Sequence, residues 1–223
     1  MQSKPTRRLG IALLRFAGLY HFFHDMRRDR QFRESSRERV TVWENLGRPA
    51  PPPDIVKYAC IRRYARSRKI PIFVETGTFK GNAIFSLRNE FREIHSIELS
   101  EELYVRATKD LGHLKRVHLH LGDSTVELPR VAAGLKGSAL YWLDGHFCSG
   151  PSARGAKDTP IFEELSFLLS RPPGDDVVLV DDARLFSGRD GYPTVEELRS
   201  MVAAKRPGAS FEVRDDIIRI VPV

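Results

Sequence analysis

Residues 54–223 alternate between short apolar runs and segments whose apolar residues recur at helical spacing. The run Ile72-Phe73-Val74 is continuous, as expected for a strand buried on both faces of a parallel sheet. A helical pattern extends from Asp54 to about Arg68. The pattern further predicts strands at residues 94–98, 117–121, 139–144 and 176–182, and helices near residues 84–87, 101–111, 126–135, 160–169 and 194–204.

Two more strands are expected at the C-terminal end, at residues 211–213 and 217–221. Only Arg214-Asp215-Asp216 separates them, and so short a link permits only an antiparallel hairpin. Strands that alternate with helices and end in a hairpin predict an α/β fold. We therefore expect a Rossmann-like, doubly wound, seven-stranded sheet that is mainly parallel, with one antiparallel strand in the C-terminal hairpin.

Residues 1–53 form an extension that differs from this domain at 54–223. Residues 9–23 are mostly apolar but include Arg15, and they predict an amphipathic helix too short and too broken to span a bilayer. This helix either packs on the domain or on a partner subunit of a homo-oligomer, or it makes a peripheral membrane contact. A proline-rich spacer at residues 47–53 ends helical structure before the domain begins.

The formal net charge of +7 is concentrated in the first part of the chain. Residues 1–69 contain 17 Lys and Arg against 6 Asp and Glu, whereas the remainder is weakly acidic. This distribution argues against a nucleic-acid enzyme with a basic catalytic face, although it leaves open a contact of the basic arm with phosphate or anionic lipid. The two cysteines, Cys60 and Cys148, are too few for a disulfide framework, so we expect a reducing, cytoplasmic location.

A glycine turn follows the first strand, in the segment Glu75-Thr-Gly77-Thr78-Phe-Lys-Gly81. Glycine lets the backbone turn sharply and approach a ligand closely. The spacing is G-x-x-x-G rather than G-x-G-x-x-G, and Glu75 would repel a pyrophosphate. Both features disfavour a nicotinamide-dependent reductase.

Acidic residues stand at successive strand ends, where ligands bind in doubly wound sheets. They are Glu75, Glu98, Asp144, Asp181 and Asp182. Glu98 is placed to accept both hydroxyls of a ribose. Asp123, in the turn Gly122-Asp-Ser124, either receives an adenine amine or acts as an ordinary helix cap.

Together, the Glu75–Gly81 turn, Ser96-Ile-Glu98-Leu, Gly122-Asp-Ser124 and Trp142-Leu-Asp144 resemble the class I S-adenosylmethionine-dependent methyltransferases. Within that superfamily, the turn and the arrangement of Asp144 with Asp181-Asp182 are similar to the metal-dependent O-methyltransferases of the catechol and macrocin type. The resemblance implies S-adenosylmethionine as cofactor, bound by Glu75, Gly77, Thr78, Gly81, Glu98, Asp123, Ser124 and Asp144.

The same resemblance implies Asp144, Asp181 and Asp182 as ligands of a magnesium ion. Three carboxylates brought together raise one another's pKa values unless a hard divalent cation neutralises them. Successive side chains of a strand point to opposite faces, so Asp182 must lie just past the strand end, or one of the pair is structural.

The catalytic base departs from the catechol pattern, because Phe147 stands where that enzyme has a lysine. His146 is the best substitute, with Lys157 second, and Asp144 completes the expected catalytic group. The loop at 148–157 has the small residues expected of a lid, and its Arg154 and Lys157 are candidates for contact with an anionic substrate.

The expected reaction is O-methylation of a sugar or another hydroxylated small molecule, assisted by the metal. Two alternatives stay open at this point. One is a metal-independent methyltransferase that uses His146 as its base. The other is a non-catalytic Rossmann-like nucleotide-binding module whose basic extension docks a partner.

Overall fold

The computed structural model describes residues 19–144, 159–189 and 191–223. The chain divides into two compact units, Met1–Gly47 and Arg48–Val223. The second unit contains the sheet and all the candidate site residues that the structure describes. His146 and Lys157, together with Phe147, Cys148 and Arg154, lie outside the described residues.

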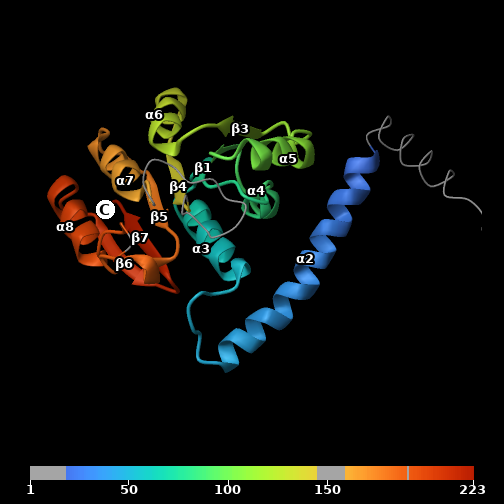
Figure 1. Cartoon of the computed structure of the whole chain (residues 1–223), viewed down its shortest axis with the longest axis horizontal. Helices are drawn as coiled ribbons and strands as arrows, with labels where there is room; N and C mark the ends of the chain where they lie inside the picture. Colours follow the sequence, from blue (N-terminus) through green and yellow to red (C-terminus); the bar gives the residue numbers. More distant parts are fainter. Residues whose placement is uncertain (1–18, 145–158, 190) are drawn as a thin grey trace, which may run out of the picture. The chain divides into compact units, whose positions relative to one another are not determined.

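The second unit is built on one seven-stranded sheet with the order β3-β2-β1-β4-β5-β7-β6 (Figure 1). Its strands are β1 Ile72–Thr76, β2 Glu93–Glu98, β3 Val117–Leu121, β4 Ala139–Leu143, β5 Val177–Val180, β6 Ser210–Arg214 and β7 Ile217–Val221. Strand β7 runs antiparallel to both β5 and β6, and the other pairings are parallel. The expected fold class, including the single reversed strand, is confirmed.

Two helical layers cover the sheet. One face packs against α6 (Ser124–Gly134), α7 (Ile161–Ser170) and α8 (Val195–Lys205), whose buried side chains form the main core with those of Ile72, Val74 and Tyr141. The other face is covered by α3 (Asp54–Ser67), α4 (Asn82–Leu87) and α5 (Glu101–Leu111). All five residues of β1 are buried, because the strand is paired on both sides and covered on both faces.

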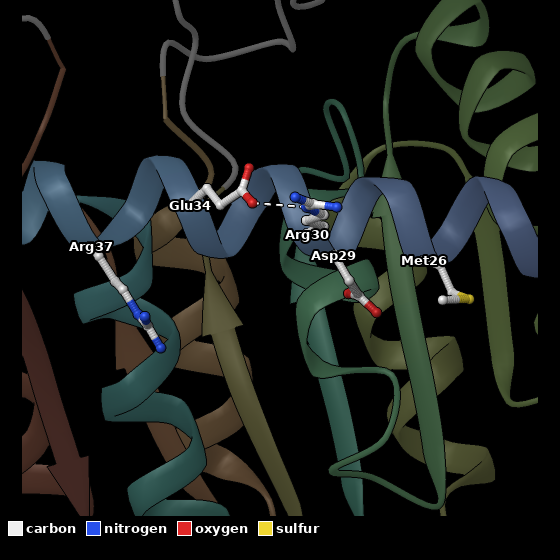
Figure 2. A pocket seen from close by; sticks show the side chains of 5 residues that line it. All are labelled: Met26, Asp29, Arg30, Glu34 and Arg37. Carbon is white, nitrogen blue, oxygen red and sulfur yellow. Dashed lines mark hydrogen bonds and ion pairs between the residues drawn. The ribbon is translucent and has the colours of Figure 1, made fainter.

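The first unit contains α2, a helix that runs from Leu19 to Asn45. Residues 9–18 of the predicted amphipathic helix lie outside the described part, whereas residues 19–23 begin α2. Met26, Asp29, Arg30, Glu34 and Arg37 follow one side of this helix at helical spacing, and Arg30 Nε lies 2.8 Å from Glu34 Oε1 (Figure 2). Of the helices in the described ranges, none has a long enough apolar stretch to cross a membrane.

Three histidines gather on one face of the β2–β3 edge. His95 pairs in register with His118, and their rings stack with centroids 4.9 Å apart. His95 Nδ1 lies 3.0 Å from His120 Nε2, and His95 Nε2 lies 2.9 Å from Glu93 Oε1. Burial lowers the pKa values of both His95 and His120, so their neutral forms are favoured in the folded state.

We expect this cluster to make the fold sensitive to acid. A histidine whose folded-state pKa is depressed contributes stability above its unfolded pKa of about 6.5, and that stability is lost as the pH falls. The variant His120→Gln should therefore lose less stability than the wild type between pH 7.5 and 5.5, as measured by urea unfolding. His24→Gln, a change in the other unit, is the control. Equal losses in the wild type and His120→Gln would contradict the expectation.

Candidate active site

The candidate site lies at the carboxyl ends of β2, β1, β4 and β5, which are neighbours in the sheet. The chain leaves β1 and β4 for helices on opposite faces, so a topological switch point falls between these two strands. The register places Glu75 beside Ser96 on one side and beside Trp142 on the other. Ligand-binding groups after these strands therefore converge on one edge of the sheet.

The glycine turn after β1 contains several residues with left-handed backbone φ angles. Gly77, Phe79 and Gly81 have φ angles of 87°, 47° and 62°. A Cβ atom added to Gly81 would lie 2.5 Å from Leu111 Cδ1, so packing against α5 as well as φ favours glycine there. Phe79 carries a side chain in this unfavourable region and is stabilised by the hydrogen bond from its N–H group to Glu98 Oε2, at 2.8 Å.

Glu98 joins the turn to the end of β2. Its second oxygen, Oε1, accepts a hydrogen bond from the N–H group of Ser100 at 2.9 Å, and the residue is buried. An ionised carboxylate has about four acceptor positions, of which these two bonds use two. The remaining positions leave capacity for the pair of ribose hydroxyls that the sequence predicts for Glu98.

Glu75 and Thr78 lie beneath the turn rather than on its surface. The Ser96 hydroxyl donates to Glu75 Oε1 at 2.7 Å, so the Thr78 hydroxyl, 2.5 Å from Ser96 Oγ, is the donor of the second bond. Burial raises the pKa of Glu75 to about 8. Both side chains are almost completely buried, which places them as supports of the turn in this structure.

Asp123 caps α6. Its Oδ1 atom accepts hydrogen bonds from the backbone N–H and the hydroxyl of Thr125, at 2.8 and 2.7 Å. The alternative that the sequence left open for this residue, a helix cap, is therefore present. Ser124 begins α6 and lies near the buried carboxylate of Glu164 on α7.

Asp144, Asp181 and Asp182 form a carboxylate cluster, with one oxygen from each lying within 4.8 Å of the others. Leu143 pairs with Val180 at the ends of β4 and β5, so Asp144 and Asp181 follow side by side. Side-chain alternation sends both to the face that α3 covers. Asp182 has a left-handed φ of 56°, which breaks the alternation and brings its carboxylate to the same side. It lies past the end of β5, the first of the two alternatives that the sequence left open.

The environment of the carboxylate cluster disfavours the ionised forms of Asp144 and Asp181. Burial, with Asp181 and Asp182 nearby, raises the pKa of Asp144 well above its usual range. Burial also raises the pKa of Asp181 to about 7, although Lys57 and the backbone N–H of Asp182 lower it. Like charges in a site that excludes water oppose one another's ionisation, so the cluster depends on cations for its charged form.

Lys57, on α3, supplies one such cation. Its Nζ atom lies 2.6 Å from Asp181 Oδ2 and 3.1 Å from Asp182 Oδ1, and its side chain is only 12% exposed. Burial opposes the charged form of Lys57, but Asp181 and Asp182 outweigh burial and raise its pKa. Sequence reasoning missed this residue, because a lysine in the first turns of a helix ordinarily faces solvent.

Arg184 supplies a second cation and fixes the turn after β5. Its Nη1 atom lies 2.8 Å from Asp182 Oδ1 and also pairs with Asp216 in the β6–β7 turn. Asp216 accepts hydrogen bonds from the N–H groups of Ala183, on its backbone oxygen, and Arg184, on Oδ1, both at 2.8 Å. The hairpin turn therefore holds the segment that carries Asp182.

Glu164 is a further buried carboxylate at this edge, on α7, and it too was missed from the sequence. Burial raises its pKa to about 7, while the Ser124 and Thr76 hydroxyls oppose that shift. Neither carboxylate oxygen has a partner at normal hydrogen-bond geometry among the described residues. The buried environment of Glu164 therefore disfavours its ionised form.

No protein-family profile matches the sequence, and no curated protein matches it. Solved structures do resemble it in three dimensions. They include the O-methyltransferase TomG from Streptomyces achromogenes in complex with SAM (TM-score 0.55, 17% identity, 85% of this chain and 90% of that one) and an O-methyltransferase from Bacillus cereus with SAH (0.53, 17%, 84% and 90%). The SAH-bound methyltransferase PaMTH1 from Podospora anserina is also similar (0.53, 18%, 75% and 78%). The resemblance to class I methyltransferases is confirmed at the level of the fold.

The buried position of Glu164 predicts a specific pH dependence. Its folded-state pKa is raised above the unfolded value, so its stabilising contribution is lost as the pH rises through about 7. Glu164→Gln removes this titration. The variant should gain stability relative to the wild type between pH 5 and 9, by roughly 3 kcal/mol at most for a shift from 4.5 to about 7.

Urea unfolding at both pH values measures this difference, with the exposed Glu196→Gln as the control. A constant difference between Glu164→Gln and the wild type across the pH range would show that Glu164 ionises freely in the folded state.

Proposed function

We propose that this protein is an S-adenosylmethionine-dependent methyltransferase that methylates a hydroxyl group with the help of a divalent metal ion. One observation carries the proposal: Glu98 and the carboxylate cluster lie on opposite sides of β1 and its glycine turn. Glu98 ends β2, and the carboxylate cluster follows β4 and β5. A cofactor held by the turn and an acceptor held by the cluster would then meet at the switch point. The similarity of the fold to that of O-methyltransferases supports this assignment.

The residues around the turn fit the adenosyl part of the cofactor. Glu98 retains acceptor positions for two ribose hydroxyls, and its bonds to Phe79 and Ser100 hold its carboxylate in place before any ligand arrives. Gly77, with a left-handed φ of 87° and no Cβ atom, favours close approach of a ligand to the backbone of the turn. Asp123 and Ser124 stand at the start of α6, next to the end of β3. When bound, the cofactor supplies the electrophilic methyl group.

The carboxylate cluster fits a hard divalent cation. Its three donors are carboxylate oxygens within 4.8 Å of one another, which suits Mg²⁺ rather than zinc or copper. Asp144, Asp181 and Asp182 would hold the ion, which would lower the pKa of an acceptor hydroxyl and orient it. The chain's own part is to keep the three side chains converged: Thr76 fixes the backbone of Asp144, and Asp216 fixes the turn after Asp182.

The proposal includes the parts of the chemistry that fall on residues 145–158. His146 follows the Asp144 strand end by two residues, and its ordinary pKa suits proton removal near neutral pH. Lys157 is the second candidate for the base. The low aromatic content of 9% favours a sugar or another polar hydroxylated acceptor over a flat apolar ring.

Cofactor recognition predicts that Glu98→Gln binds adenosylhomocysteine at least ~10-fold more weakly than the wild type. The reason is that each charge-assisted hydrogen bond contributes roughly 1.5–3 kcal/mol. Isothermal titration calorimetry measures the affinity, and Glu102→Gln, an exposed change on α5, is the control. A folded Glu98→Gln protein with wild-type affinity would remove Glu98 from the cofactor site, and a wild type that fails to bind adenosylhomocysteine would refute the methyltransferase assignment.

Metal assistance predicts that Asp181→Asn loses methyl transfer by ~100-fold or more, because the cation that activates the acceptor is held less well. Its affinity for adenosylhomocysteine should stay within a few-fold of the wild type. Release of adenosylhomocysteine is followed with a panel of sugar and catechol acceptors, before and after EDTA, with Mg²⁺ added back. Turnover that survives complete chelation would refute the metal requirement and leave His146 as the base.

A further inference from the structure

Lys57 occupies the place where a cation is expected in the carboxylate cluster. Its ammonium group donates to one oxygen each of Asp181 and Asp182, at 2.6 and 3.1 Å. These are two of the three residues whose oxygens converge. A divalent ion held by the same carboxylates would use oxygens that the ammonium group now contacts.

The two cations of the cluster differ in how they are held. Arg184 is tied to Asp216 as well as to Asp182, so it is fixed to the hairpin turn. Lys57 makes hydrogen bonds only to Asp181 and Asp182 among the described residues, and it reaches them on a flexible four-carbon stem. Lys57 can therefore leave the carboxylates without breaking any other bond, whereas Arg184 cannot.

We propose that Lys57 is an internal counter-ion that competes with a divalent metal ion for the Asp181 and Asp182 carboxylates and so sets the affinity of the site for that ion. This inference rests on the metal-assisted form of the proposed function. With the ammonium group in place the carboxylates stay paired and converged. The ammonium charge of Lys57 would repel a divalent ion bound to the same carboxylates, so binding of the ion favours displacement of that group.

The competition makes a direct prediction for metal binding. Lys57→Met removes the competing charge and keeps much of the side-chain volume, so the variant should bind Mn²⁺ at least ~10-fold more tightly than the wild type. Titration calorimetry with MnCl₂ measures this, with no acceptor or turnover needed. Lys109→Met, an exposed change on α5 with the same loss of charge, should bind Mn²⁺ as the wild type does.

A second measurement controls for a loss of stability, because removal of Lys57 takes away the cation that pairs with the buried Asp181 and one of the cations beside Asp182. The proposal predicts that Mn²⁺ raises the melting temperature of Lys57→Met and Lys57→Gln by more than it raises that of the wild type. Equal or weaker Mn²⁺ affinity in the Lys57 variants, or an equal or smaller thermal shift, would overturn it.

Adenosylhomocysteine binding by the same proteins separates the two proposals. If the wild type binds adenosylhomocysteine but the Lys57 variants gain no Mn²⁺ affinity, only the competition is wrong. If the wild type binds no adenosylhomocysteine, the methyltransferase assignment fails, and the Mn²⁺ comparison still decides the role of Lys57.

Discussion

The arrangement of the site depends on how buried negative charge is compensated. Asp144 and Asp181 are directed to one face by side-chain alternation on neighbouring strands, and the left-handed backbone of Asp182 adds a third carboxylate. Desolvation makes such a group costly unless cations stand beside it. In this structure they come from two distant places: Lys57 from α3, before the first strand, and Arg184 from the turn after β5, braced by the β6–β7 hairpin.

The other half of the site is organised by hydrogen bonds to Glu98. This carboxylate links the left-handed Phe79 of the glycine turn to the start of α5, and so connects β1 and β2 on the side of β1 away from the carboxylate cluster. Glu75 and Thr78 support the turn from below through Ser96. The region between Glu98 and Asp144 is thus bordered by two acidic groups of different character, one bonded to backbone N–H groups and one paired with side-chain cations.

Sequence patterns were sufficient to predict the sheet, because β1, β4 and β5 contain continuous apolar runs between helices, and the link of Arg214-Asp215-Asp216 allowed only a hairpin. They also placed the carboxylates at the strand ends. They did not predict Lys57, since its contact with Asp181 joins residues 124 positions apart and leaves no local signal. The helix at residues 24–45 was missed because it is rich in charge and has little apolar periodicity; side-chain pairs such as Arg30 and Glu34 support it instead.

The two-residue β6–β7 turn holds another part of the chain in place, the segment that follows β5. Exposed loop tips are common sites of tolerated insertions. Here Asp216 binds the backbone of Ala183 and Arg184 with both its main-chain and its side-chain oxygens. An extra residue in this turn would therefore move Asp216 away from Ala183 and Arg184, so the length of the hairpin loop is tied to the position of Asp182.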